Sequence, residues 1–236
     1  MYKKKHRVRI YKRRFKVSRD KIFLVYRILY DKYGPQGWWP VGGVYFPPHV
    51  DRYEIIAGAI LTQNTSWKNA SQALKALCEK ELLDPEKILK LKPAELAGLI
   101  RSSGYYNQKA ERLLAITELY LKTTAEGRKP ERKELLSVRG IGPETADSIL
   151  LYAYHEPVFV VDAYTRRTFM RMGLLKGELS YDKIQKVFMK SLPRDEKLYN
   201  EYHALIVRHG KDVCQKAPIC NKCILWNKRL CRFKID

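Results

Sequence analysis

Apolar residues recur at helical spacing along most of this chain. Between residues 20 and 33, Ile22, Val25, Tyr26 and Leu29 follow one another at intervals of three and four, so they share one face of a helix. Asp20 is a suitable N-cap for that helix. Similar patterns, separated by glycine and proline, predict helices over residues 54–61, 67–80, 84–91, 93–101, 108–123, 131–137, 163–172, 182–191 and 196–211. No sustained strand pattern follows residue 20, so an all-α fold is predicted.

A glycine turn interrupts the helical pattern at residues 138–142, which read Val-Arg-Gly-Ile-Gly. Pro143 follows and can open a new helix, because the first amides of a helix have no internal partner and none is lost. The free amides of Gly140 and Gly142, with the positive end of the helix dipole, can bind a phosphate group. Such a turn is also a common tight connection between helices, and that alternative stays open here.

A single acid, Asp162, follows the apolar run Val158–Val161 and precedes Arg166 and Arg167. Such an acid is either the N-cap of the next helix or a catalytic carboxylate. A phosphate-binding turn so close upstream favours catalysis on a phosphodiester polymer. Glu144, just inside the new helix, either complements the helix dipole or lines a pocket. Tyr152 and Tyr154, by contrast, are assigned to helix packing.

Charge points to a polyanionic partner. The net charge is +21 and the isoelectric point is about 9.8. Residues 1–19 contain no acid and form either a solvated tail or an arm that binds a nucleic-acid backbone. No apolar run is long enough to span a bilayer, and the first residues lack the apolar region of a secretory signal. We therefore expect a cytoplasmic, DNA-associated monomer that does not enter membranes.

Aromatic residues are concentrated in the loop Gly37–Pro48, which carries Trp38, Trp39, Tyr45 and Phe46. They are either a plug on the core or a stacking surface for a base drawn out of a double helix. The polar turn at residues 62–66 contains Gln63 and Asn64, which are either turn formers or side chains that fill a gap in a DNA stack.

Four cysteines lie close together near the end of the chain, with the spacing C-x5-C-x2-C-x7-C: Cys214, Cys220, Cys223 and Cys231. Disulfides are uncommon in a reducing cytosol, so a metal site is predicted. Zinc knuckles usually contain two C-x2-C pairs and this run has one, whereas a [4Fe-4S] cluster can take all four thiolates from one loop. Both metals stay open. Cys78 has no such neighbours and is assigned to the core.

Taken together, these motifs resemble the helix-hairpin-helix DNA glycosylases of the endonuclease III superfamily. The resemblance covers nearly the whole chain from about Asp20. Gly140–Ala146 is similar to the family hairpin, Val160–Asp162 to its catalytic aspartate segment, and Ile60–Thr65 to the segment that replaces an extruded base. The four cysteines resemble the family's cluster loop.

The resemblance implies a domain organisation and a function. Residues 20–52 and 158–236 would form a terminal-helix domain with a [4Fe-4S] cluster, residues 53–157 a six-helix domain with the hairpin at 131–154, and residues 1–19 a basic arm. The protein would extrude and remove a damaged base from double-stranded DNA, with Asp162 assisting water. The implied DNA contacts are Gln63, Asn64, Arg139, Gly140, Gly142, Arg166 and Arg167.

Two departures from the family pattern matter. Glu144 stands where the bifunctional enzymes carry the lysine that forms a Schiff base, and a carboxylate cannot form an imine. This favours a monofunctional glycosylase, with Lys211 as the lysine that could offer weak lyase activity. The cysteine spacing also differs from the family's usual C-x6-C-x2-C-x5-C.

Within the superfamily, the tryptophan pair and the glutamate hairpin most resemble the 3-methyladenine (alkylpurine) glycosylases. Trp38, Trp39 and Trp67 would then form a wall that attracts cationic purines by stacking and cation–π interaction. The alternatives are a glycosylase and lyase for oxidised pyrimidines, a mismatch-specific glycosylase, and a DNA-binding protein without catalytic activity.

Overall fold

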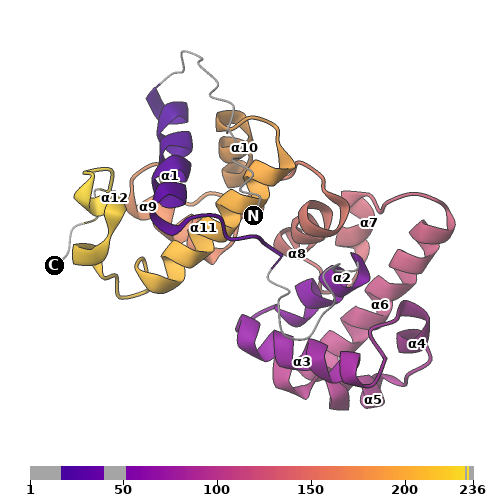
Figure 1. The fold of residues 1–236 in the computed structure, drawn as a ribbon. Helices are drawn as coiled ribbons and strands as arrows, with labels where there is room; N and C mark the ends of the chain where they lie inside the picture. The colour runs from indigo at the N-terminus through magenta and orange to yellow at the C-terminus, as the bar shows by residue number, and fades with distance from the viewer. Residues whose placement is uncertain (1–16, 40–51, 232, 234–236) are drawn as a thin grey trace, which may run out of the picture.

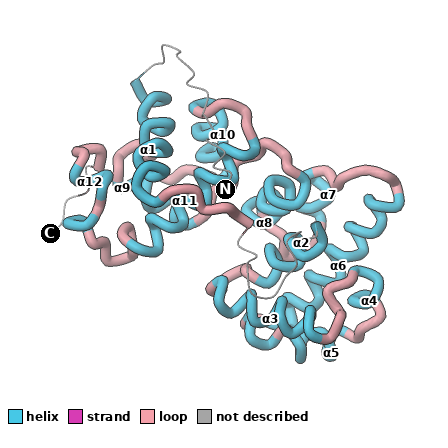
Figure 2. Tube along the Cα trace, in the orientation of Figure 1, coloured by secondary structure: helices cyan, strands magenta, loops and turns pink. Residues whose placement is uncertain are grey.

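The computed structural model describes residues 17–39, 52–231 and 233, and throughout this part of the chain it contains only helices and loops (Figure 2). This confirms the all-α prediction. The helices are α1 (Val17–Tyr33), α2 (Arg52–Leu61), α3 (Trp67–Glu79), α4 (Pro85–Leu89), α5 (Pro93–Leu99), α6 (Tyr106–Ala125), α7 (Arg132–Ser137), α8 (Pro143–Ser148), α9 (Ala163–Arg171), α10 (Tyr181–Ser191), α11 (Glu196–Asp212) and α12 (Ile224–Asn227). The short 3-10 helices Arg101–Ser103 and Cys220–Lys222 and a π-helical segment, η2 (Ile149–Ala153), complete the list. No described helix is long and apolar enough to cross a membrane.

One predicted boundary is wrong. Helix α1 begins at Val17, so Asp20 lies inside its first turns and is not the cap. No proline or glycine at residues 17–19 stops the helix from extending upstream. Elsewhere the predicted starts agree within a few residues; Ser66, for example, caps α3 by accepting a bond from the Asn69 amide at 3.3 Å. The predicted basic arm (1–19), apart from residues 17–19, lies outside the described residues, as do Tyr45 and Phe46.

The helices form two groups (Figure 1). Helix α1 lies near the N-terminus and packs against α10, α11 and α12, which lie near the C-terminus of the chain. The second group contains α2–α8, in which α6 contacts α2, α4, α5 and α7. The segment η2 contacts α2 in one group and α11 in the other, so it lies at their junction.

Stacked aromatic side chains fill the core of the first group. Phe159 stacks on Phe188 with a centroid distance of 4.3 Å, and Tyr202 packs edge-on against Phe159 at 5.9 Å. All three are fully buried. Aromatic pairs of this kind contribute about 0.5–1.5 kcal/mol each beyond their burial. Because Phe159 is three residues before Asp162, this packing also fixes the path of the chain into that aspartate.

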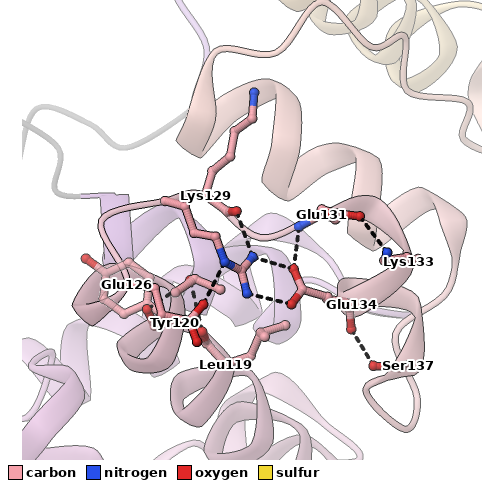
Figure 3. Close-up of polar contacts among 10 residues, drawn as sticks. Leu119, Tyr120, Glu126, Lys129, Glu131, Lys133, Glu134 and Ser137 are labelled. Atoms are coloured by element: carbon pink, nitrogen blue, oxygen red, sulfur yellow. Dashed lines mark hydrogen bonds and ion pairs between the residues drawn. The ribbon is translucent and has the colours of Figure 1, made fainter.

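An ion cluster around Arg128 fixes the entry to α7, the first helix of the hairpin (Figure 3). The guanidinium donates two bonds to Glu134, at 2.7 and 2.8 Å, and one to Glu126 at 2.6 Å. Glu134 also accepts the Glu131 amide at 2.8 Å, which completes a capping box. The Arg128 hydrogen bonds lower the pKa of Glu134 to about 2.

Candidate active site and nucleic-acid interface

The hairpin between α7 and α8 has a backbone that requires glycine at residue 140. Gly140 has a φ of 85°, and a Cβ there would lie 2.2 Å from Nε of Arg112. Ile141 is 5% exposed and anchors the turn in the core, while Arg139, Gly140 and Gly142 are exposed. The turn therefore presents its glycines to solvent at the start of α8, as phosphate binding requires.

The polar turn after α2 lies directly against this hairpin. The Gln63 side-chain amide donates to the Gly140 carbonyl at 3.1 Å and to the Thr145 hydroxyl at 2.9 Å. Its oxygen accepts a bond from Arg112 at 2.8 Å. Asn64 is exposed with a φ of 51°, and so projects freely. The structure thus brings together the two segments predicted to contact DNA.

A buried lysine that was missing from the prediction supports this turn. Lys109 Nζ donates to the carbonyls of Leu61 at 2.8 Å and Ser103 at 2.7 Å, and the residue is 0% exposed. Burial, and to a lesser degree the nearby Arg112, lowers its pKa to about 8. Lys109 joins the turn after α2 to the loop that presents Tyr105, which is 65% exposed. A lysine in an amphipathic helix carries no sequence signal for such a role.

Asp162 occupies the N-cap of α9, and each of its two oxygens has a polar neighbour. Oδ1 accepts the Thr165 amide at 2.6 Å, and Oδ2 lies 3.6 Å from Nε2 of His203 on α11. The two side chains are 10% and 8% exposed. Burial alone would raise the pKa of Asp162, but the interactions with His203 and Thr165 outweigh it and hold the pKa below its usual value. The capping role and a charged, partly accessible carboxylate are therefore compatible.

His203 connects Asp162 to Tyr152. The Tyr152 hydroxyl lies 2.5 Å from His203 Nδ1. Burial, with the charges of Asp162 and Glu201, raises the pKa of Tyr152 well above its usual value. The assignment of Tyr152 to helix packing is incomplete, because its hydroxyl faces the active site; Tyr154 lies under Arg52 at 4.9 Å. His203 was not predicted, since one histidine in a helical pattern has no diagnostic spacing.

Three tryptophans and Tyr152 pack together next to His203, and we call them the aromatic cluster. Trp39 lies 5.0 Å from Tyr152 and 5.5 Å from Trp67, while Trp38 lies 5.8 Å from His203 between ring centroids. All three tryptophans are half-buried. Nε1 of Trp39 is buried and has no hydrogen-bond partner among the residues that the structure describes. The cluster therefore packs on the protein beside His203, the neighbour of Asp162, and a stacking role toward an extruded base stays a prediction.

Glu144 lies in the first turn of α8 and faces Asp162. Although its side chain keeps a solvent-accessible surface, surrounding protein atoms desolvate it, and this desolvation together with the Asp162 charge raises its pKa to about 7. Two neighbouring carboxyls thus have pKa values that are pushed apart, one below and one above the usual range.

The arginines after Asp162 bind protein carbonyls. Arg166 donates to Leu179 at 2.5 Å, and Arg167 donates to Cys214 at 2.8 Å and Gly210 at 3.1 Å. These bonds hold the fold together, and the predicted DNA contacts of Arg166 and Arg167 stay a prediction. Lys211 is eight residues beyond His203 on α11, about 12 Å along the helix. Lys211 is exposed there, and the adjacent Gly210 packs against Tyr164 in the first turn of α9.

The four C-terminal cysteines line one hollow, together with Arg171, Val213, Pro218, Trp226 and Phe233. Two outer donors face the sulfurs: Arg171 lies 3.4 Å from Cys214 Sγ and His209 Nε2 lies 3.6 Å from Cys223 Sγ. Within the described residues, no three His, Cys, Asp or Glu side chains are placed to hold a single metal ion. Cys78 is half-buried in α3, apart from this group.

Comparisons with known proteins agree with this geometry. Residues 57–194 match the family described as HhH-GPD superfamily base excision DNA repair protein. A protein of Methanocaldococcus jannaschii, provisionally named a DNA repair glycosylase, is 45% identical over 91% of this chain and 97% of its own length. The endonuclease III of Thermotoga maritima is 31% identical over 78% of this chain and 84% of its own.

Solved structures show the same fold. The 3-methyladenine DNA glycosylase of H. pylori, bound to 1,N6-ethenoadenine, superimposes with a TM-score of 0.68 at 29% identity, covering 82% of this chain and 97% of that one. A trapped endonuclease III–DNA covalent intermediate has a TM-score of 0.75 at 23% identity, covering 92% of this chain and 97% of that one. The chain therefore belongs to the HhH-GPD superfamily of base excision DNA repair proteins and is a DNA N-glycosylase.

Proposed function

We propose that this glycosylase removes alkylated purines from duplex DNA by hydrolysis and leaves the strand intact. The observation that carries the proposal is the aromatic cluster beside Asp162. Electron-rich ring faces attract a cationic purine by about 0.5–2 kcal/mol per contact, and such a base also stacks on them. Trp39 is fixed in this cluster because its indole edge packs against Gly58 of α2. The H. pylori 3-methyladenine glycosylase, with its similar fold, supports the same substrate class.

Asp162 would act on the sugar. The bond between C1′ and the purine nitrogen breaks, and its electron pair neutralises the cationic base as it leaves. The ionised Asp162 stabilises the positive charge that develops on the sugar, an electrostatic effect favoured in a partly dehydrated site. Water then attacks C1′ and its proton passes to the Asp162 carboxylate. An alkylated purine departs as a neutral base, so the reaction needs no strong acid.

Glu144 supports hydrolysis without strand cleavage. Cleavage by the lyase route needs an amine that forms an imine with C1′, and Glu144 stands at the hairpin position where that amine would be. Lys109 is enclosed and donates to two carbonyls, so it is not placed to replace the missing amine. Lys211 is the exposed lysine that the borohydride experiment below tests.

Phosphate binding would come from the exposed hairpin, with the amides of Gly140 and Gly142 and the charge of Arg139. Gln63 or Asn64 would fill the space that the extruded nucleotide leaves. Gln63 would need to leave its bonds to Gly140 and Thr145, whereas Asn64 is already exposed. The protein would act on DNA as a monomer.

The cysteine hollow fits a [4Fe-4S] cluster better than zinc. Four thiolates of one zinc ion converge on a single point, and these sulfurs surround a hollow without such convergence. In a cluster each thiolate binds a different iron, so the sulfurs stand further apart. Cys214, Cys220, Cys223 and Cys231 would hold the cluster, which would cross-link the loop after α11; no step of the base removal above involves it.

Base release from duplexes that each carry one lesion tests the proposal. We expect wild type to release 3-methyladenine, which is cationic in DNA and leaves as a neutral base, and Asp162→Asn to lose about 100-fold or more in single-turnover rate. An Asp162→Asn variant as active as wild type would exclude the catalytic role of Asp162. Release of an oxidised pyrimidine, or of a normal base from a mismatch, in place of alkylated purines would establish one of the other substrate classes.

Borohydride trapping tests the absence of a lyase. An imine intermediate would be reduced to a stable protein–DNA adduct, and we expect none from wild type. As a matched comparison, Glu144→Lys restores an amine at the hairpin position and should yield an adduct. Trapping of wild-type protein at high yield would overturn the monofunctional assignment.

A further inference from the structure

His203 and Tyr152 enclose Asp162 but take no part in the hydrolysis described above. They come from different elements, α11 and η2, and the chain between them is 50 residues long. Tyr152 is 3% exposed and His203 is 6% exposed. Two buried polar side chains aligned behind a carboxylate are costly unless they satisfy one another. Whether both side chains are satisfied therefore depends on which of their atoms carry the protons.

The Tyr152 hydroxyl determines which imidazole nitrogen carries the proton. At 2.5 Å from Nδ1, the phenol O–H can donate to the lone pair of that nitrogen. The proton of a neutral imidazole then resides on Nε2, which lies 3.6 Å from Asp162 Oδ2. In the opposite tautomer the Nε2 lone pair would face the carboxylate, and the two would repel. A buried phenol next to the carboxylate keeps its own proton, which favours the first arrangement.

We infer that Tyr152 and His203 are positioning residues that present an Nε2–H donor to Asp162 and so keep its carboxylate ionised and correctly turned toward the sugar. The inference rests on the catalytic role proposed for Asp162. With Oδ1 held by the Thr165 amide and Oδ2 facing His203, the plane of the carboxylate is fixed. Each carboxylate oxygen has two acceptor sites, so one on each remains for water and the developing sugar cation.

Other acidic groups lie near Asp162 and Tyr152. Glu144 on α8 repels the Asp162 carboxylate. Glu201 on α11 raises the pKa of Tyr152, as Asp162 does. The carboxylate thus stands among like charges, and His203 is the group with a donor proton that faces Oδ2. Removal of His203 should therefore favour protonation of Asp162.

Activity against pH separates this role from plain packing. Single-turnover release of methylated bases from duplex DNA treated with dimethyl sulfate is measured for wild type, Asp162→Asn, His203→Leu, His203→Gln and Tyr152→Phe. His203→Leu should lower the rate at pH 7 by about 10- to 100-fold, because the carboxylate loses its orientation. The acid limb of the pH–rate profile of His203→Leu should move to higher pH, because Asp162 in that variant takes up a proton at higher pH. His203→Gln, whose amide N–H can replace Nε2–H, should recover part of the rate.

Matched controls exclude general effects of the substitutions. Tyr154→Phe removes a hydroxyl from the turn that follows η2 and should leave the rate and the pH profile unchanged. His155→Asn removes an exposed histidine at a φ of 54°, which asparagine tolerates, and should do the same. Binding of each variant to a duplex with an abasic-site analogue, and its thermal midpoint, show whether it is folded.

The ring nitrogens of His203 provide a readout that does not depend on activity. Nitrogen NMR of histidine-labelled protein, with the residue assigned by its loss in His203→Gln, should show protonated Nε2 and unprotonated Nδ1 at neutral pH. Tyr152→Phe should move part of the His203 proton from Nε2 to Nδ1, because the phenol donor to Nδ1 is lost. A wild-type Nδ1–H tautomer would overturn the inference, even where His203→Leu proves too unstable to assay.

The outcomes separate this inference from the proposed function. If Asp162→Asn abolishes base release while His203→Leu and Tyr152→Phe keep the wild-type rate and acid limb, the positioning role is wrong and the catalytic assignment stands. If Asp162→Asn retains full activity, the catalytic assignment itself fails.

Discussion

At the scale of single residues, the hairpin shows why one glycine cannot be replaced. Gly140 combines a positive φ with a neighbour, the Arg112 side chain, that fills the space of any Cβ. Arg112 also binds Gln63, so the same side chain that excludes a Cβ at Gly140 holds the turn expected to enter the DNA. A substitution at residue 140 thus disturbs the glycine turn proposed to bind phosphate and the Gln63 turn at once.

We predict that Gly140→Ala destabilises the protein by about 1–2 kcal/mol from the left-handed backbone alone, with a further loss from displacement of Arg112. Binding to duplex DNA should weaken as well, because Gln63 loses a partner. Gly98→Ala is the matched control: nothing lies within 4 Å of its Cβ, and it is a helical residue in α5. It should stabilise by up to about 1 kcal/mol. Thermal unfolding and fluorescence anisotropy measure both effects, and equal midpoints for the two variants would contradict the prediction.

Glu144 gives a prediction with a defined sign in pH. Its folded pKa of about 7 exceeds the ordinary carboxyl value, so the folded state favours the protonated form. Stability from this group is present at low pH and is lost as pH rises from the ordinary carboxyl range through about 7. Glu144→Gln mimics the protonated form and should raise the thermal midpoint more at pH 8 than at pH 4. The side chain is open to solvent, so the gain is small. A larger gain at pH 4 would contradict the assignment.

These residue-scale features differ in how far the sequence reveals them. The glycine turn and Asp162 are visible because turn chemistry and capping depend on neighbours in the chain. Lys109 and His203 are not visible, since their partners are 48 and 41 residues away. The carbonyl partners of Arg166 and Arg167 were not visible either, since Leu179 and Cys214 lie 13 and 47 residues away.

At the scale of elements, the buried carboxylate of Asp147 joins the two helices of the hairpin to α10. Arg132 on α7 donates to the two oxygens of Asp147 on α8 at 2.7 and 3.1 Å. Gln185 on α10 donates to the same carboxylate at 2.7 Å and to the Phe159 carbonyl at 2.8 Å. Because Phe159 leads into Asp162, this group of bonds ties the hairpin to the segment that carries the proposed catalytic aspartate.

Asp147→Ala should therefore cost about 3 kcal/mol of unfolding free energy, since Asp147 is fully buried and both Arg132 and Gln185 lose their acceptor. Asp182→Ala is the control. Asp182 also contacts Arg132, at 3.2 Å, but its side chain is 59% exposed, and exposed pairs contribute less than about 1 kcal/mol. Urea unfolding of the two variants checks the contrast, and a loss for Asp182→Ala as large as that for Asp147→Ala would refute it.

At the scale of the whole molecule, α9 connects the active site to the cysteine loop. Asp162 caps its first turn, and Arg167 and Arg171 in its later turns hold the carbonyls of Cys214, Gln215 and Lys216. If the proposed [4Fe-4S] cluster were lost, the loop would lose its four thiolate–iron bonds, but the arginine contacts would still hold its first part.

We predict that anaerobically purified protein contains about four irons per chain and absorbs light at about 400 nm, as a [4Fe-4S] cluster requires. Cys223→Ser should lower the iron content and the thermal midpoint and expose residues 215–231 to proteolysis. Cys78→Ser changes a half-buried cysteine of α3 outside the hollow and should leave the iron content unchanged. A colourless protein that contains zinc would refute the cluster assignment.

The sequence by itself determined the all-α class, most helix positions, the hairpin and the four-cysteine loop. Each of these depends on periodicity, capping or spacing within a few neighbouring residues, where physical chemistry is local. It also indicated Asp162 through its position after an apolar run.

The tertiary structure decided which of these features meet. It placed Gln63 on Gly140, Tyr152 and His203 behind Asp162, and the aromatic cluster beside them. Tyr33 and His209, 176 residues apart, share a hydrogen bond behind the cysteine hollow in the same way. Such contacts arise when amphipathic helices bury their apolar faces together, and the partner of a polar side chain is then chosen by packing. No local pattern records that choice, so the groups that surround Asp162 emerge only in the folded protein.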